Sequence, residues 1–174
     1  MELYVERGFE QTTVAEIAER AGLTARTFFR YFPSKESVLL AEVESRCAEL
    51  ITLLEAQPAA VPPLEAIRSA MLTVVAPLQG DRTHLVRRDR LIAATPSLHA
   101  HKLTDKEAWR DAIFDVLVAR EADSKRPSSR LQLHLVTATA LAAVEAALAT
   151  WLDEDGDLVE IVNRSFDAVA AGLR

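Results

Sequence analysis

The sequence contains a single cysteine, only five glycines and no long apolar run free of charge. The one cysteine, Cys47, excludes an intramolecular disulfide and any cysteine-ligated metal cluster, and it fits a reducing compartment. The most apolar run, Val136 to Leu152, is interrupted by Glu145 and consists largely of Ala and Thr, so no membrane role is expected. The first ten residues also lack the basic and apolar regions of a signal peptide, so we expect a cytoplasmic protein.

Catalytic motifs are missing as well. The sequence has no GxSxG, P-loop, GxGxxG or HExxH pattern. Of its four histidines, His99 and His101 form one close pair, but residues two apart on a helix point to different faces and cannot jointly bind a metal. The sequence therefore does not favour an enzyme, and we expect no catalytic residue, metal or cofactor.

Positive charge is scarce overall but concentrated in one segment. The formal net charge of −6 argues against a protein that coats nucleic acid with its whole surface. Between Arg20 and Lys35, however, there are four basic residues and no acidic one. The same segment places four aromatic rings within residues 28–32. The basic surface is thus expected in one small region, next to unusual aromatic bulk.

Capping signals divide this region into short helices. Thr13 and Glu16 have the spacing of a capping box, and Gly22 can supply the left-handed residue that ends a helix of about two turns. Thr24 can cap a second short helix that runs to about Phe32, where the following proline ends it. Two short helices joined by a tight turn with glycine make a helix-turn-helix.

The two sides of the second short helix differ in character. Phe28 and Phe32 lie four residues apart on one face and are expected in the core, against Leu23, Ile17 and Val14. The other side carries Ala25, Arg26, Phe29 and Arg30. Some of the aromatic rings therefore hold a small domain together, and others lie on its surface.

The rest of the chain is also expected to be helical. Ser34 can cap a helix that runs to about Ala56, and the proline-containing residues 57–63 resemble a linker. Further helices are expected at about residues 64–78, 81–94, 97–121, 128–152 and 158–173. The predicted fold class is all-α, with about nine helices of which the first is short.

The segment Ser128–Leu152 is hydrophobic nearly all round. One flank can bury against its own domain, and the other needs a second partner, for which another copy of the same helix in a two-fold dimer is the favoured candidate. A central core helix of a monomer is the alternative. The residues expected at the dimer interface are Leu141, Val144, Leu148, Trp151, Val162 and Phe166.

Residues 8–39, GFEQTTVAEIAERAGLTARTFFRYFPSKESVL, resemble the N-terminal DNA-binding domain of the TetR family of bacterial transcriptional regulators. The resemblance rests on Gly8-Phe9, Thr12-Thr13-Val14, Ile17-Ala18, Ala21-Gly22, Phe28-Phe29, Tyr31-Phe32 and Ser34-Lys35-Glu36. It implies a homodimer that binds a pseudo-palindromic DNA operator, most commonly a repressor released by a small, mostly apolar effector. It also implies a helix-turn-helix DNA-binding domain at residues 1–46 and a ligand-binding and dimerisation domain at residues 47–174.

The resemblance places the second short helix in the major groove of DNA. There Arg26 can donate a bidentate pair to guanine, Thr27 can offer a hydroxyl to a base or phosphate, and Phe29 can contact a thymine methyl. Phosphate contacts that set register are expected from Thr13, Tyr31 and Lys35, with Arg30 in either role and Thr24 and Ala25 completing the set. The alternatives are solvated arginines, a lysine paired with an acid on its own helix, and a Tyr31 ring that is mainly core.

An effector pocket is expected between the helices of the second domain. Its candidate lining is Met71, Val75, Leu91, Trp109, Ile113, Phe114, Leu117 and Thr137, with His84 or His134 as further polar anchors. The alternative for each apolar residue is a place in the core. The group Arg82, Arg87, Arg88 and Arg90 can meet an anionic effector such as an acyl-CoA, or can form a solvated helix face.

Two features depart from the family pattern. Many members carry Tyr where this chain has Phe29, so one phosphate-directed hydroxyl is missing. Only residues 1–7 precede the Gly-Phe pair, where members usually have a full first helix, so either the chain is a shortened form or its true start lies upstream. An alternative function follows: a helical dimeric sensor or interaction protein in which DNA binding is lost or weakened.

Overall fold

The computed structural model describes residues 2–122 and 127–172, and every regular element within these ranges is helical. The all-α class is therefore confirmed. The first three helices are short: α1 (Glu2–Arg7), α2 (Val14–Arg20) and α3 (Ala25–Tyr31). The others are α4 (Lys35–Glu55), α5 (Pro63–Val75), α6 (Arg82–Ala94), α7 (Pro96–Glu121), α8 (Arg130–Asp153) and α9 (Leu158–Gly172), with a 3-10 segment, η1 (Ala76–Asp81), between α5 and α6.

One predicted helix differs from the observed structure. The expected helix at residues 64–78 is α-helical only to Val75 and continues as the 3-10 segment η1. Pro77 explains the change, because it has no N–H to donate and its ring clashes with the carbonyl four residues earlier in an α-helix.

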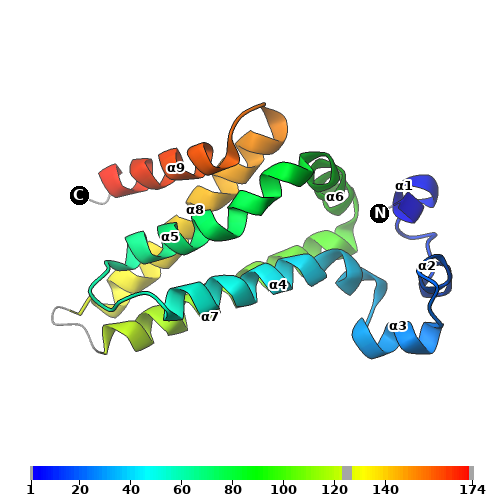
Figure 1. The fold of residues 1–174 in the computed structure, drawn as a ribbon, viewed down its shortest axis with the longest axis horizontal. Coiled ribbons are helices and arrows are strands. Elements are labelled where there is room, and N and C mark those ends of the chain that lie inside the picture. Colours follow the sequence, from blue (N-terminus) through cyan, green and yellow to red (C-terminus); the bar gives the residue numbers. More distant parts are fainter. Residues whose placement is uncertain (1, 123–126, 173–174) are drawn as a thin grey trace.

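The helices form an elongated molecule with α1, α2 and α3 gathered at one end (Figure 1). Helix α4 leads away from this end and packs along α7, while α8 packs against α7 and α9 (Figure 1). A large core fills the space between α4, α5, α7, α8 and α9, and its fully buried side chains include Leu50, Ile67, Leu117, Trp151 and Phe166. The boundary expected after residue 46 falls inside α4, which is continuous there.

A second, smaller core joins the N-terminal helices to the rest of the molecule. Its buried members are Tyr4, Phe9, Leu39, Leu40, Ile92 and Leu98. The first four belong to α1, the turn after it and α4, whereas Ile92 and Leu98 come from α6 and α7. The α6–α7 corner therefore supplies part of the core that holds α1 and the turn after it against α4.

Two arginines bind the backbone where long helices end. The guanidinium of Arg120 donates to the carbonyl oxygens of Leu54, Gln57, Pro58 and Val61 at 2.7 to 3.3 Å. The guanidinium of Arg82 donates to those of Trp151, Leu152 and Glu154 at 3.0 to 3.2 Å. The last carbonyls of a helix lack partners within it and carry partial negative charge, so these cations stabilise the ends of α4 and α8.

Candidate functional site

The turn between α2 and α3 has the geometry that its sequence predicts. Gly22 has a positive φ of 69°, and its N–H donates to the Glu19 carbonyl at 3.0 Å, while the next N–H, of Leu23, donates to Ala18 at 2.8 Å. These are the two backbone hydrogen bonds that define a Schellman motif at the end of a helix, and the motif favours glycine at its left-handed position. Helix α3 starts at the next cap, where the Thr24 hydroxyl accepts from the N–H of Thr27 at 3.1 Å.

One side of α3 is anchored by aromatic packing. Phe28 is buried, and its ring lies 5.5 Å from that of Phe32 and 5.6 Å, edge to face, from that of Phe29. The expected place of Leu23 in this core is wrong, because its side chain is 40% exposed. Leu23 follows the left-handed glycine, so its backbone closes the end of α2 while its side chain projects from the turn.

The other side of α3 exposes positive charge and aromatic rings. Phe29 is 55% exposed and Tyr31 is 64% exposed, so a mainly buried Tyr31 ring is excluded. Arg30 donates to the Tyr31 hydroxyl at 3.0 Å, and its guanidinium carbon lies 4.8 Å from the centre of that ring. Arg26 is exposed, and within the described part of the chain it makes no hydrogen bond or ion pair. An unpaired arginine on a helix this firmly anchored is available to a partner.

Two of the expected phosphate ligands are occupied inside the protein. The Thr13 hydroxyl donates to Glu16 at 2.9 Å and accepts from the Glu16 N–H, so an anion at the start of α2 would meet a carboxylate. The ammonium of Lys35 donates to three backbone carbonyls. These are all the donors that a lysine has, so neither the expected phosphate contact nor the alternative acidic helix partner is observed.

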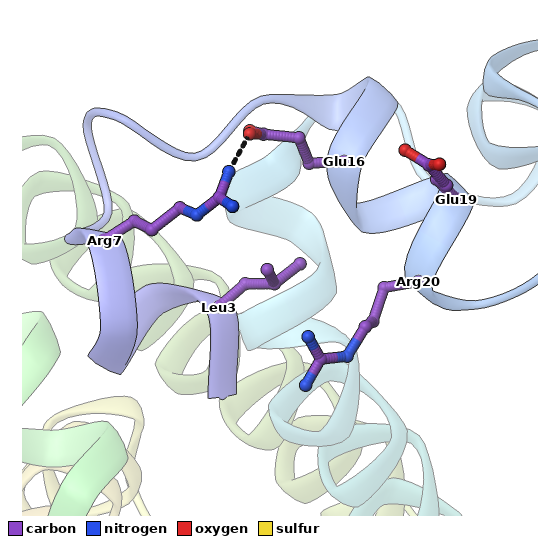
Figure 2. Close-up of a pocket in the computed structure, with 5 residues that line it drawn as sticks. All are labelled: Leu3, Arg7, Glu16, Glu19 and Arg20. Carbon is purple, nitrogen blue, oxygen red and sulfur yellow. Dashed lines mark hydrogen bonds and ion pairs between the residues drawn. The ribbon is translucent and has the colours of Figure 1, made fainter.

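A shallow hollow lies between α1 and α2, lined by Leu3, Arg7, Glu16, Glu19 and Arg20 (Figure 2). Arg7 reaches across its rim to form an ion pair with Glu16 (Figure 2). Four of the five lining residues are charged, so this hollow does not resemble the apolar effector pocket that the sequence predicts.

The residues expected to bind an effector lie mostly in the large core. Six of the eight are buried: Met71, Val75, Ile113, Phe114, Leu117 and Thr137. Trp109 packs against the same core, whereas Leu91 belongs with the smaller one and lies apart from the rest. Thr137 is 1% exposed, and its hydroxyl has no hydrogen-bond partner among the described residues. A buried hydroxyl without a partner is costly, which makes this position notable.

The polar candidates around this region have separate roles. His134 is exposed and stacks on the Phe114 ring at 3.9 Å, with Arg130 placed 5.0 Å from the same ring. The Arg82 guanidinium binds backbone carbonyls at the end of α8. Arg88 is largely buried, and its Nη1 lies 3.3 Å from Oε2 of Glu42. The expected arginine group is thus divided, and only Arg87 and Arg90 lie on an exposed surface.

The expected dimer interface needs correction. Trp151, Val162 and Phe166 are at most 1% exposed, and Leu141 and Val144 are also buried, all within the large core. Their side chains are enclosed by their own protomer and have no surface left for a second copy. Leu148 alone is partly exposed.

The opposite side of α8 is apolar and exposed. It carries Leu131, Leu135, Ala138, Ala142, Ala146 and Ala149, which we call the α8 outer stripe. By length and composition α8 could cross a membrane, although only 33% of its apolar window is buried, and one such helix is weak evidence because the core helix of a soluble protein passes the same test. The run from Val136 to Leu152 leaves out Leu131 and Leu135, so it is less apolar than the longer helix α8.

A helix-turn-helix with an unpaired arginine, joined to a helical bundle with an uncovered apolar stripe, defines a DNA-binding regulator. Residues 1–41 match the profile of bacterial regulatory proteins of the tetR family, and residues 61–174 match that of the MftR C-terminal domain. The chain belongs to the TetR family of transcriptional regulators, which bind operator DNA as dimers and respond to small-molecule effectors.

Similar proteins agree with this assignment. A protein of Mycobacterium tuberculosis named as the mycofactocin biosynthesis transcriptional regulator MftR is 32% identical over 174 residues, which cover 99% of this chain and 86% of the relative. The HTH-type transcriptional regulator TcmR of Streptomyces glaucescens is 31% identical, covering 100% of this chain and 79% of TcmR. The crystal structure of Thermus thermophilus FadR, a TetR-family repressor in complex with lauroyl-CoA, has the same fold, with a TM-score of 0.57 and 24% identity over 100% of this chain and 91% of FadR.

The capping box of α2 predicts a pH-dependent stability. Hydrogen bonds from the Thr13 backbone and side chain, together with Arg7, hold the pKa of the Glu16 carboxyl below its usual value. A carboxyl whose pKa is lower in the folded than in the unfolded protein stabilises the fold at pH values above the ordinary glutamate pKa. This contribution disappears as the pH falls through the pKa of the folded state. Glu16→Gln should therefore lower the melting temperature at pH 7 and lower it less at pH 3. Glu19→Gln, on the exposed side of the same helix, is the control, and a Glu16→Gln deficit that is equal at both pH values would contradict this reasoning.

Proposed function

We propose that this regulator represses transcription by placing α3 of each protomer in successive major grooves of its operator. Arg26 carries the proposal, because it is the exposed, unpaired cation on a helix whose other side is locked by Phe28. Its guanidinium reads guanine, and Phe29 beside it contacts a thymine methyl or sugar. Arg30 and Tyr31 contact the phosphate backbone, and Thr24, Ala25 and Thr27 lie at the start of the same helix, against the DNA.

The proposed domain division is one of function, since α4 runs unbroken across it. Residues 1–46 bind DNA and residues 47–174 bind effector and partner, with α4 common to both. Since its operator is part of the chromosomal DNA, the protein works in the cytoplasm. The family consists of regulators, and the described residues include no group of three or more His, Cys, Asp or Glu side chains placed to hold a metal ion.

The dimer of the proposal forms through the α8 outer stripe. Leu131 is 68% exposed and Leu135 is 48% exposed, and the four alanines that continue the stripe permit close approach of a second helix. Burying an apolar helix face of this length is the kind of contact that a stable two-fold dimer requires. The same contact sets the distance between the two α3 helices.

The effector of the proposal is a mostly apolar molecule bound among α5, α7 and α8. Thr137 supports this location, since its buried hydroxyl would gain a partner when a polar group of the ligand enters. The repressor FadR of similar fold was crystallised with lauroyl-CoA, so a fatty acyl thioester is the first class to test.

Release from DNA is a shift between two dimer geometries. The small core of Tyr4, Phe9, Leu39, Leu40, Ile92 and Leu98 couples the two domains, because it combines residues of α1 and α4 with residues of the α6–α7 corner. An effector that moves α7 moves this corner, and α4 carries the displacement to the helix-turn-helix. The two α3 helices then no longer match the spacing of successive major grooves.

Arg26→Ala should abolish preference for the operator. We expect about a 10- to 100-fold loss of affinity for each half-site, the value of one bidentate arginine–guanine contact. The measurement is fluorescence anisotropy with the dimer and tiled duplexes from the DNA flanking its gene, at two salt concentrations. Arg110→Ala, an exposed arginine on α7, is the control. Equal binding to every duplex, unaffected by Arg26→Ala, would instead support the alternative function, a helical sensor or interaction protein that has lost sequence-specific DNA binding.

Ala142→Arg should separate the dimer. Ala142 lies in the middle of the α8 outer stripe, and a charged side chain there would be buried without a partner in a two-fold contact. Sedimentation velocity should show a monomer with the same thermal stability per chain and at least tenfold weaker operator binding. Ala108→Arg, also exposed in the middle of a helix but on α7, should stay dimeric. A dimeric Ala142→Arg protein would place the interface elsewhere.

Thr137→Val should affect the free and bound protein in opposite directions. Removing a buried hydroxyl that has no partner should stabilise the free protein by about 1 kcal/mol. Lauroyl-CoA binding, followed by calorimetry, should become several-fold weaker. Thr73→Val, at an exposed position on α5 whose hydroxyl donates to Ser69, is the control. Equal lauroyl-CoA affinity in the wild type and Thr137→Val would remove Thr137 from the effector site.

A further inference from the structure

The first residue of α4, Lys35, is surrounded by backbone oxygens of the turn that joins α1 to α2. Its ammonium donates to the carbonyls of Phe9 at 2.8 Å, Glu10 at 3.2 Å and Thr12 at 3.1 Å. It also lies 4.4 Å from the centre of the Phe9 ring, within the range of a cation–π contact. The charge of Lys35 is therefore directed into the protein by four separate contacts.

Two further hydrogen bonds tie the same turn. The Tyr4 hydroxyl of α1 donates to the Lys35 carbonyl at 3.1 Å, and the buried Thr12 hydroxyl donates to the Gly8 carbonyl at 2.8 Å. Burial, with a smaller effect of Glu36, raises the pKa of Tyr4 to about 12, so its hydroxyl keeps its proton at every physiological pH. We call Lys35, Tyr4 and Thr12 together the turn clasp.

The clasp joins the two chain segments that flank the helix-turn-helix, because Tyr4 and Thr12 precede α2 and Lys35 follows α3. Thr12, whose carbonyl Lys35 binds, precedes Thr13, the cap of α2, and the Schellman turn then passes the orientation of α2 to α3. Phe9, bound by both its carbonyl and its ring, is also a member of the small core that includes Ile92 and Leu98. A displacement of Lys35 would therefore change how α3 is held relative to α4.

We infer that Lys35 is a positioning residue for operator recognition: it sets the orientation of the helix-turn-helix through three backbone carbonyls and does not bind phosphate. The inference rests on the proposed function, because it supposes that α3 reads DNA. It assigns to the turn clasp a role in sequence preference, which a side chain bound to phosphate does not have.

The alternatives differ in what they predict for operator and random DNA. Loss of a phosphate contact weakens binding to both duplexes equally, and with two copies of Lys35 in the dimer it lowers the slope of log affinity against log salt by about 1.8. Loss of positioning weakens binding to the operator much more than to random DNA. A purely structural role lowers the melting temperature without changing the ratio of the two affinities.

The test measures operator and random-duplex affinities of the dimer for Lys35→Met, with Lys106→Met as the matched control, because the Lys106 ammonium pairs with Glu145 of α8. We expect the operator-to-random ratio to fall at least tenfold, with random-DNA affinity and its salt slope unchanged. An unchanged ratio would overturn the inference, whether or not the salt slope falls.

Tyr4→Phe is the second variant, and it keeps the inference testable if Lys35→Met does not fold. It loosens the same clasp without changing any charge, so a lower operator-to-random ratio cannot come from a lost phosphate contact. We expect a several-fold fall in this ratio, and an unaffected ratio in folded Tyr4→Phe would count against the clasp. Failure of the wild type to prefer any duplex would refute the proposed DNA reading itself, separately from these outcomes.

Discussion

Backbone carbonyls that lack partners at the ends of elements are the constraint on which this structure depends. Helical chains leave such oxygens wherever a helix stops, and this chain meets the need with long cationic side chains from elsewhere in the sequence. Arg120 binds the end of α4 and the linker after it, Arg82 binds the end of α8, and Lys35 binds the turn after α1. Each contact joins segments far apart in the chain. These three cations therefore provide partners for the carbonyl oxygens and also hold distant parts of the polypeptide together.

The charged residues fall into two groups, those that bind backbone carbonyls within the protein and those that are left to bind a partner. A lysine or arginine engaged with several carbonyls is not available to DNA or effector, even when its sequence context suggests otherwise. Arg26 differs from Lys35 because no carbonyl, carboxylate or ring of the described protein lies against it. The contrast between two cations nine positions apart locates the DNA-facing surface on α3 and the supporting structure behind it.

Much of the N-terminal region could be predicted from the sequence because its signals are local. The Thr13 and Glu16 capping box, the left-handed Gly22, the Thr24 cap and the burial of Phe28 each depend on residues within a few positions, and the structure confirms all of them. The exposed side of α3 followed from the same helical spacing. Leu23 was misplaced because a turn residue has no fixed helical face to which periodicity applies.

The larger helices were predictable as elements, but the partners of their faces were not. An apolar residue on α8 or α9 has the same pattern whether it faces its own core or a second copy, so Val162, Phe166 and Trp151 were assigned to the wrong side. Tertiary packing alone decided that the large core of their own protomer encloses them and that the leucines and alanines of the outer stripe stay exposed. The sequence by itself thus determined the helices, their caps and the DNA-reading face, which local hydrogen bonds and periodicity govern. Only the tertiary structure decided which cationic side chains are bound within the protein, which helix faces are covered and how the effector-binding domain packs on the DNA-binding domain. These features depend on contacts between residues distant in the chain.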